Sequence, residues 1–230
     1  MKKKLCAVIV AAGRGSRMGA DINKVYLPLG KMTVLAHCVS AFIDSGIVDE
    51  YVVVTAKQDF ERCRAALYEL RTAYTLVEGG ADRQQSVLNG ISAATAEYCA
   101  VHDGARAVIS PQLICDTAAC AKKFGAAAPG IVPKDTPKLD NGEGFIEKTL
   151  ERNVIRMIQT PQIFLREELL AAHLAAKKAS FSATDDCMIM EKYSDRKIKI
   201  VDGSYENIKL TTPEDMYTAE RIIEKRSGSR

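Results

Sequence analysis

Residues 5–19 read LCAVIVAAGRGSRMG, an apolar run that continues directly into a loop of small and basic residues. A short apolar run bounded by glycine predicts a strand covered on both faces, as in the parallel sheets of α/β domains. The loop then lies at the carboxyl end of the strand, where such sheets bind ligands. Its small residues, whose N–H groups an anion can approach closely, are Ala11, Ala12, Gly13 and Gly15. Because Arg17 adds a fixed positive charge, the stretch predicts a phosphate-binding loop.

The spacing of the loop excludes two common phosphate-binding motifs. The dinucleotide fingerprint G-x-G-x-x-G requires its third glycine one position before Gly19, and the P-loop pattern G-x-x-x-x-G-K-[ST] is absent. Lys24 follows five residues after Gly19, so the same glycine-rich turn has an arginine within it and a lysine shortly after it. That pairing suits a triphosphate whose pyrophosphate leaves. The alternative is a surface turn with solvated basic residues.

Composition limits the classes of protein to consider. The 230 residues suffice for one α/β domain with a good core, and no linker divides them, so we expect a single domain over residues 1–230. A net charge of +3, 6% aromatic residues and no Trp argue against a general nucleic-acid binder. No segment approaches the roughly 18 consecutive apolar residues of a membrane span. Seven cysteines without a C-x-x-C motif fit a cytoplasmic protein.

The start of the chain imitates a secretory signal, because Met1 and three lysines precede an apolar run. The run is interrupted at once by the glycine-rich loop and has no separate cleavage region. Removing it would delete the first strand and the phosphate-binding loop. We therefore expect no signal peptide.

Strand and helix patterns alternate after the loop. The predicted strands are residues 50–55, 74–77 and 98–102, and the predicted helices are residues 33–44, 59–70, 84–94 and 111–124. Thr212 and Pro213 open a last helix. This alternation predicts an α/β fold with a doubly wound, mostly parallel sheet.

The alternation breaks at residues 132–149, where two polar extended runs are joined by Asp140, Asn141 and Gly142. This pattern predicts a β-hairpin with a type I′ turn, which forms a protruding arm over about residues 132–152. An isolated two-stranded ribbon is marginal in water, so we expect it to pack against a second subunit. The alternative is a hairpin folded onto its own domain.

Polar clusters follow two further strands. Residues 79–86 read GGADRQQS after the third strand, so Gly80 and the Ser86 hydroxyl are candidates for contacting a base or ribose, with a plain strand-to-helix turn as the alternative. Asp103 follows the fourth strand and is the candidate ligand for Mg²⁺, which prefers carboxylate and phosphate oxygens. His102 precedes it and is interpreted as a core or supporting residue.

Two late segments have both a structural and a functional interpretation. Thr184 begins a T-D-D segment that suits a helix cap or a substrate contact, and capping is the better interpretation of the segment alone. Lys209 lies at another strand end, where it is a candidate phosphate-binding cation or a solvated lysine.

Taken together, these motifs resemble the 2-C-methyl-D-erythritol 4-phosphate cytidylyltransferase family of the non-mevalonate isoprenoid pathway. The resemblance runs from about Ala7 to Asp215. The motifs that carry it, in order, are A-A-G-x-G-x-R-M, Lys24, G-G…R-x-x-S, V-H-D-x-A-R, D-T, E-R-N…Q-T-P-Q at residues 151–162, T-D-D and E-N-I-K.

The resemblance implies a Rossmann-like nucleotidyltransferase fold, a homodimer interlocked through the arm, and roles for particular residues. In the resemblance, Arg17 and Lys24 would bind the phosphates of CTP, Lys209 would lie near its α-phosphate, and Asp103 would bind Mg²⁺. The residues that would line the rest of the CTP site are Ala11, Ala12, Gly13, Gly15, Gly80 and Ser86. For the polyol phosphate, Thr136 and Arg152 would reach the neighbouring subunit's site, with Arg106, Thr160 and Thr184 close by.

The chain departs from the common family pattern at four positions: Asn23, Ala81, Gly104 and Ala107. Proline is common where Asn23 stands, and an acidic residue where Ala81 stands. These departures bear on the stiffness of the loop and on nucleotide affinity more than on the type of reaction.

The predicted function is cytidylyl transfer from CTP to 2-C-methyl-D-erythritol 4-phosphate. Within the same chemistry, the alternative acceptor is another polyol phosphate such as ribitol 5-phosphate. From other classes, the alternatives are a nicotinamide-dependent oxidoreductase and a nucleotide sensor. The strand at residues 50–55 argues against the oxidoreductase, because it ends in Thr55 without the acidic residue that binds an adenosine ribose.

Overall fold

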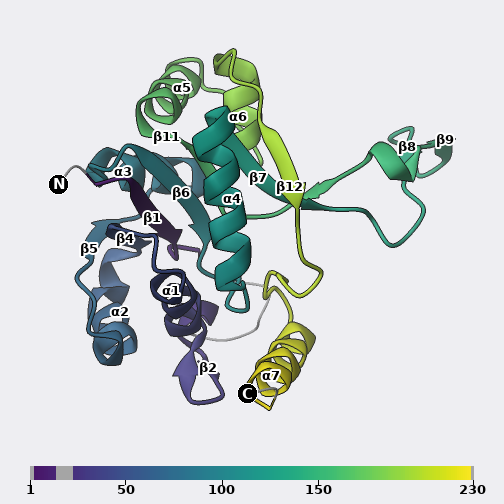
Figure 1. Ribbon diagram of the computed structural model, residues 1–230. Helices are drawn as coiled ribbons and strands as arrows, with labels where there is room; N and C mark the ends of the chain where they lie inside the picture. The colour runs from purple at the N-terminus through teal and green to yellow at the C-terminus, as the bar shows by residue number, and fades with distance from the viewer. Residues whose placement is uncertain (1–2, 14–22, 229–230) are drawn as a thin grey trace.

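The computed structural model describes residues 3–13 and 23–228. An eight-stranded sheet forms its centre (Figure 1). In spatial order the strands are β10 (Met157–Ile158), β7 (Ala126–Ile131), β11 (Gln162–Leu165), β6 (Tyr98–Asp103), β1 (Leu5–Val10), β4 (Glu50–Thr55) and β5 (Thr75–Glu78), while β12 (Lys199–Asp202) pairs with β7. Pairs β1–β4, β1–β6, β4–β5 and β7–β12 are parallel, whereas β10 and β11 run antiparallel to their neighbours. The predicted doubly wound, mostly parallel sheet is confirmed.

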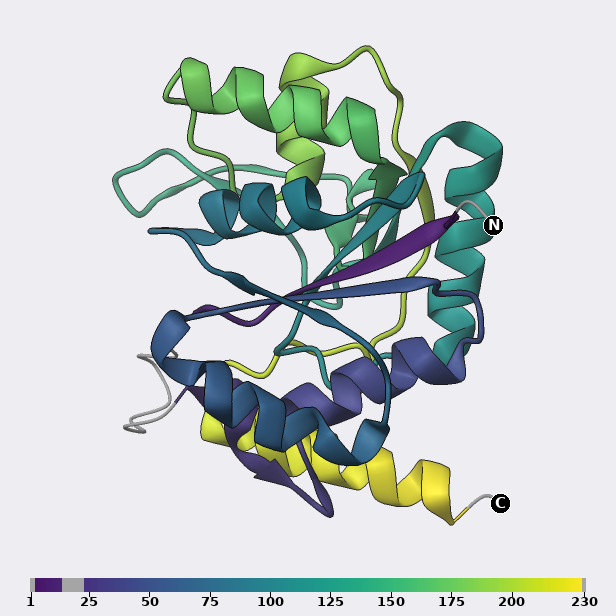
Figure 2. The same cartoon turned by 90° about the vertical axis from the view of Figure 1, so that its left-hand side faces the viewer.

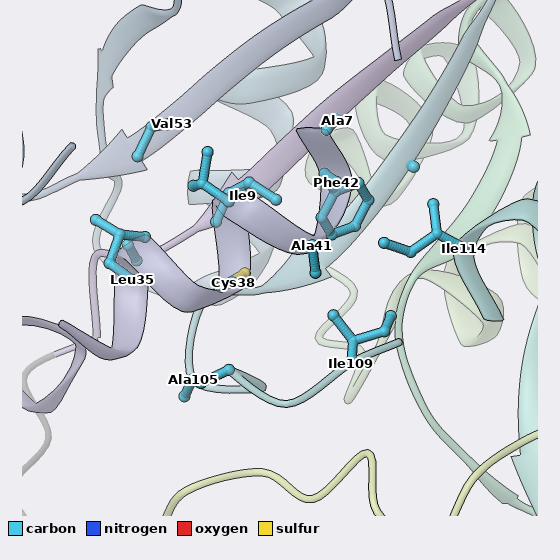
Figure 3. Close-up of a cluster of buried hydrophobic side chains, with 14 of the residues drawn as sticks. Ala7, Ile9, Leu35, Cys38, Ala41, Phe42, Val53, Ala105, Ile109 and Ile114 are labelled. Atoms are coloured by element: carbon cyan, nitrogen blue, oxygen red, sulfur yellow. The ribbon is translucent and has the colours of Figure 1, made fainter. Parts of the chain in front are cut away.

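Helices cover both faces of this sheet. Alternate residues of the central strands therefore belong to two separate hydrophobic cores, one on each face. Ala7 and Ile9 of β1 belong to one cluster, and Cys6 and Val8 to the other. Figure 3 shows part of the first cluster, where Ile9 lies beside Phe42. Both faces of β1 are therefore buried, as its continuous apolar pattern predicts.

The helices divide between the two faces (Figure 2). Helices α1 (Val34–Asp44), α2 (Phe60–Leu67), α4 (Pro111–Phe124) and α7 (Pro213–Ser227) contribute to the first cluster, and α3 (Arg83–Ala93), α5 (Arg166–Lys178) and α6 (Asp186–Tyr193) to the second. No helix in residues 3–13 or 23–228 is long and apolar enough to cross a membrane.

Predicted element boundaries agree with the structure to within a residue or two, with one difference of type. The second predicted helix ends three residues early, at Leu67, and continues as a single 3₁₀ turn, η4 (Tyr68–Leu70). The sequence patterns did not predict β7, β10, β11, β12, α5 or α6. They also did not indicate the short elements η2 (Lys24–Tyr26), β2 (Pro28–Leu29), β3 (Met32–Thr33), η3 (Lys57–Asp59) and η5 (Arg152–Val154).

The predicted hairpin is present as β8 (Lys138–Asp140) and β9 (Ile146–Thr149), on an arm that projects from the sheet (Figure 1). Its predicted type I′ turn is wrong. That turn needs positive φ at two consecutive residues, whereas residues 141–145 have it only at Gly142 (89°) and Gly144 (87°). The Asp140 side chain accepts hydrogen bonds from both glycine N–H groups, at 2.6 and 3.3 Å, and this holds a five-residue loop.

Candidate active site

A cavity of about 1100 Å³ lies at the carboxyl ends of four neighbouring parallel strands. Its wall includes residues 11–13 after β1, 56–59 after β4, 79–83 after β5, and Asp103 at the end of β6. Lys24, Ser86 and Lys209 also line it. The strand-end clusters singled out in the sequence therefore meet at one place, because parallel strands end at the same edge of the sheet. The prediction that Lys209 ends a strand is wrong, because β12 ends at Asp202 and residues 203–210 form a loop.

The beginning of the phosphate-binding loop is held by backbone and side-chain hydrogen bonds. Ala11 N–H donates to the Val54 carbonyl at 2.7 Å. Asn23, which is buried, donates from Nδ2 to the Ala11 carbonyl at 2.7 Å and accepts from Val25 N–H at 3.3 Å. The residue that departs from the family's common proline therefore ties the first turn of the loop to η2, which begins with Lys24.

Ala11, Ala12 and Gly13 line the cavity, as the nucleotide-site prediction requires. Gly15 and Arg17 lie outside the described residues, so their predicted roles receive no structural account.

The loop between β5 and α3 forms the next part of the wall. The Ser86 hydroxyl accepts from Gly80 N–H at 3.0 Å and donates to the Asp82 carbonyl at 2.7 Å. A Cβ atom at Gly79 would lie 2.4 Å from the Ala12 Cβ, so glycine lets this loop pack against the loop after β1. Ser86 is buried and holds the loop's shape, in addition to lining the cavity.

Asp103 lies between two cations. Its Oδ2 is 2.7 Å from Lys209 Nζ, and its Oδ1 is 3.1 Å from Arg83 Nε. Burial raises the pKa of the Asp103 carboxyl, but Arg83 and Lys209 lower it further, so the pKa lies well below its usual range. Asp103 is therefore ionised at neutral pH and holds Lys209 at the cavity.

A hydrogen-bonded chain fixes the backbone beneath Asp103. Asp103 N–H donates to Thr160 Oγ1 at 3.1 Å, and Thr160 Oγ1 lies 3.0 Å from His102 Nδ1. His102 Nε2 lies 3.3 Å from the Arg106 carbonyl, which can only accept. The ring is therefore protonated on Nε2, and the Thr160 hydroxyl donates to Nδ1. His102 is fully buried and contacts the Phe42 ring edge, so its interpretation as a core and supporting residue agrees with the structure.

Arg106 and Thr160, two predicted contacts of the polyol phosphate, lie behind Asp103 instead of on the cavity wall. Arg106 donates from Nη1 to the Asn207 carbonyl at 2.6 Å, and Asn207 Nδ2 donates to the Thr160 carbonyl at 2.9 Å. Asn207 thereby links both residues to the segment that carries Lys209.

Three other predicted acceptor contacts do not line the cavity within this chain. Thr136 and Arg152 are exposed on the arm, where Arg152 donates to the Lys134 carbonyl at 3.1 Å. Thr184 is exposed at the start of the T-D-D segment, and its hydroxyl lies 3.7 Å from Met188 Sδ. Asp185 caps α6, so the capping interpretation of this segment agrees with the structure.

Sequence reasoning missed two groups of residues around the cavity. Lys57 and Arg62 line it after β4, and the strand-end argument applied to the other strands would have found Lys57. Arg83 and the buried Asp186 form an ion pair at 3.0 Å although 103 positions separate them. No local spacing indicates such a pair.

Comparisons with known proteins agree with this geometry. A family model described as 2-C-methyl-D-erythritol 4-phosphate cytidylyltransferase matches residues 5–225. Proteins of that name from Clostridium acetobutylicum and Caldanaerobacter subterraneus are 41% and 40% identical to this chain, and cover 96% and 95% of it with 98% of their own length.

Solved structures show the same fold. The 4-diphosphocytidyl-2C-methyl-D-erythritol synthase of Anaerococcus prevotii superposes with a TM-score of 0.87 at 28% identity, over 96% of each chain. The 2-C-methyl-D-erythritol 4-phosphate cytidylyltransferase of Thermus thermophilus superposes with a TM-score of 0.77 at 28% identity, over 97% of this chain and all of that one. The chain belongs to the 2-C-methyl-D-erythritol 4-phosphate cytidylyltransferase family.

Proposed function

We propose that this protein performs the reaction of its family in the cavity at the strand ends. It transfers a cytidylyl group from CTP to 2-C-methyl-D-erythritol 4-phosphate, giving 4-diphosphocytidyl-2-C-methyl-D-erythritol and pyrophosphate. The observation that carries the proposal is the convergence of the loop after β1, Lys24, Asp103 and Lys209 on one cavity. A triphosphate needs closely approaching N–H groups and fixed cations, and this wall offers both.

The reaction needs positioning and charge stabilisation more than covalent chemistry. An oxygen of the acceptor phosphate forms a bond to the α-phosphorus of CTP, the bond from that phosphorus to the β-phosphate oxygen breaks, and pyrophosphate leaves with the electron pair. Because the acceptor is already an anion, no strong general base is needed. Lys24, Lys209 and Arg17 would stabilise the negative charge on the equatorial oxygens and on the departing pyrophosphate.

Asp103 suits a divalent cation such as Mg²⁺. Mg²⁺ at a nucleotide commonly takes one or two carboxylates, while phosphate oxygens and waters complete its shell. Asp103 is ionised, and each of its oxygens keeps a second lone pair beyond the one facing Arg83 or Lys209. Residues 3–13 and 23–228 contain no cluster of three or more His, Cys, Asp or Glu side chains that could hold a metal ion by themselves. The bound ion would neutralise phosphate charge, and Asp103 would orient it.

The acceptor site would be completed by a second copy of the chain. On the projecting arm, Phe145 and Ile146 are exposed by 69% and 68%, and Val154 by 70%. Apolar side chains exposed on a two-stranded ribbon favour burial against a partner. A homodimer joined through the arms would bring Thr136 and Arg152 of one protomer to the polyol phosphate bound by the other, with Thr184 close by. Arg106 and Thr160 would support that site from behind Asp103, since neither lines the cavity.

Two further features belong to this proposal. The chain would act as a single domain, since the match to the family model and the sheet both span nearly all of it. All seven cysteines are unpaired thiols, which suits the reducing cytoplasm.

The test is a pyrophosphate-release screen of CTP, UTP, ATP and GTP against several polyol phosphates with Mg²⁺. We expect rapid release only with CTP and 2-C-methyl-D-erythritol 4-phosphate. Preference for ribitol 5-phosphate would move the protein to another cytidylyltransferase specificity, and preference for UTP or a sugar 1-phosphate would overturn the assignment. CTP binding without pyrophosphate release with any acceptor would identify a sensor.

A further inference from the structure

An alternating row of charged side chains runs from the cavity wall into the interior. Arg83 lies at its middle, where its Nε donates to Asp103 Oδ1 at 3.1 Å and its Nη2 to Asp186 Oδ2 at 3.0 Å. Asp186 Oδ1 lies 3.1 Å from His173 Nε2. The row begins at Lys209, which is paired with the other oxygen of Asp103.

Among residues 3–13 and 23–228, Asp186 contacts the cavity through Arg83 alone. Its side chain is 1% exposed and does not line the cavity, whereas Arg83 does. Burial raises the pKa of the Asp186 carboxyl, but the Arg83 charge and the His173 hydrogen bond lower it further, so the group is a buried anion. A buried anion is expensive unless it is paired, and its partner here is the guanidinium that also holds Asp103.

The surrounding structure fixes where Asp186 points. Gln162 of β11 is 1% exposed, and its Oε1 accepts from the N–H groups of Asp186 and Cys187, each at 3.0 Å. Gln162 Nε2 donates to Asp185 Oδ2 at 2.8 Å. The first turn of α6 is thereby attached to the central sheet, and Asp186 is held against Arg83.

His173 completes the arrangement. The Asp186 carboxylate can only accept a hydrogen bond, so the proton of this buried ring lies on Nε2. His173 Nδ1 has no partner within the described residues, which suits an unprotonated nitrogen in a buried ring. Asp186 therefore accepts one hydrogen bond from each side, and in the described part of the chain Arg83 is the residue that connects it to the site.

We propose that Asp186 is a positioning residue for the transfer reaction, acting through Arg83 to fix the carboxylate of Asp103 at the cavity. The proposal rests on the function proposed above for the same site. With Asp186 in place, one guanidinium nitrogen is committed to each carboxylate, and Arg83 cannot swing toward the triphosphate. Without the Asp186 carboxylate, Arg83 keeps only its hydrogen bond to Asp103, a carboxylate that also binds Lys209. Asp103 and Lys209 then lose their fixed alignment.

The kinetic test compares Asp186→Asn with the wild type, with rates expressed per natively folded molecule. Because Asp186 does not line the cavity, we expect kcat to fall about 10- to 100-fold, while KM for CTP changes less than about threefold. A native variant that keeps kcat within twofold, or one that loses only affinity for CTP, overturns the proposal. Glu168→Gln is the matched control, because it neutralises an acid paired with Arg196 on the same side of the sheet, away from this cavity. It should keep its kcat.

A double-mutant cycle tests the route through Arg83. If Asp186 acts through Arg83, Asp186→Asn has no further effect on kcat in an Arg83→Met background. Independent, multiplicative losses would overturn the route. The double variant also removes both members of the buried pair, so it avoids the uncompensated charge that either single change leaves.

A spectroscopic measurement separates this proposal from the proposed function. The Arg83 Nε–H signal in ¹⁵N NMR, assigned by its absence in Arg83→Met, should exchange with solvent about tenfold faster in Asp186→Asn, because the side chain loses one of its two anchors. Unchanged exchange would overturn the positioning role even if kcat fell. If the wild type transfers no cytidylyl group, the proposed function fails, and this signal still decides whether Asp186 fixes Arg83.

Discussion

At the scale of single residues, the charges around Asp103 are arranged so that the buried carboxylate is compensated while cations line the cavity. The Asp103 carboxylate is neutralised by Arg83 and Lys209, and its oxygens fix where those cations point. The polyphosphate of a nucleotide would meet cations that are already oriented. Preorganised charges stabilise a transition state without reorganising during the reaction.

Lys24 offers the direct residue-scale prediction. It lines the cavity at the start of η2, where a triphosphate's phosphates would lie. Replacing Lys24 with alanine should lower kcat by roughly 10²–10³, as the loss of one oriented transition-state donor does. Steady-state pyrophosphate release measures the effect.

The matched control for Lys24 is Lys31→Ala, which removes an exposed lysine between β2 and β3 that does not line the cavity. Its kcat should stay within twofold of the wild type. If a natively folded Lys24→Ala protein turned over as fast as this control, the role assigned to Lys24 would be wrong.

The second residue-scale prediction concerns pH and stability. Burial lowers the pKa of His102 to about 4, below the roughly 6.5 of an unfolded histidine. Between these values the unfolded chain binds the proton and the folded chain does not, so stability falls as the pH falls. From pH 8 to pH 5 the free energy of unfolding should drop by about 2 kcal/mol because of this residue.

Urea unfolding of the wild type and of His102→Gln at both pH values isolates that contribution. The other two histidines and all carboxylates remain in the variant, so the difference in pH dependence belongs to His102. The same loss of stability between pH 8 and pH 5 in both proteins would contradict a neutral, buried His102.

At the scale of elements, α3 carries Ser86 and Arg83 to the cavity, and its closeness to the sheet sets where they lie. Gly90 faces β1 and β4, where a Cβ atom would lie 2.6 Å from Val8 Cγ1 and 2.7 Å from Val54 Cγ2. Both valines are fully buried and cannot move aside. Glycine at this point lets the helix lie directly on the strands.

Gly90→Ala therefore sets two effects against each other. Alanine favours a helix over glycine by about 1 kcal/mol, whereas overpacking a tight core costs typically 1–3 kcal/mol. With two contacts well under 3 Å, we expect overpacking to win and the free energy of unfolding to fall by about 1–2 kcal/mol. Thermal and urea unfolding measure the change.

Ser92→Ala is the matched control on the same helix, since Ser92 is exposed and its hydroxyl donates to the Leu88 carbonyl of the same helix. It should change stability by less than about 0.5 kcal/mol. A Gly90→Ala protein as stable as this control would show that α3 can lift from the sheet without cost.

The elements also show which structural information local sequence contains. Strands such as β4 and helices such as α4 were predicted to the residue, because burial patterns, Pro111 and Gly125 mark them locally. The turn of the arm was predicted wrongly, because the Asp140 side chain binds two N–H groups beyond the tight turn that Asn-Gly favours.

The candidate site divides in the same way. Asp103 was found because it ends a strand, and parallel strands end together. Lys209 was placed at a strand end that the structure lacks, since β12 ends at Asp202 and a loop carries Lys209 to the cavity. The contact between Arg83 and Asp186 depends on how α3 and α6 pack on one face of the sheet, which no local pattern records.

At the scale of the whole molecule, two predicted acceptor contacts are separated from the cavity. Thr136 and Arg152 are exposed on an arm that projects from the sheet (Figure 1), and neither lines the cavity of its own chain. If the arms interlock in a homodimer, each active site combines one protomer's cavity with the partner's arm. Cyclic symmetry then gives two such composite sites.

Mixing two inactive variants tests this arrangement. Lys24→Ala impairs the cavity but keeps the arm, and Arg152→Ala impairs the arm but keeps the cavity. In a mixed dimer, one site combines both defects, and the other combines an intact cavity with an intact arm. Random mixing makes about half of the dimers mixed, so about one quarter of all sites should regain wild-type turnover.

Co-refolding the two variants and measuring pyrophosphate release gives the recovered fraction, and sedimentation gives the oligomeric state. A mixture of Lys24→Ala with Lys209→Ala is the control, because both changes lie in the cavity and no pairing restores a complete site. If the arm serves its own chain, every site in the first mixture carries one defect. Activity would then stay at the average of the two variants, and the composite site would have to be abandoned even if the protein is a dimer.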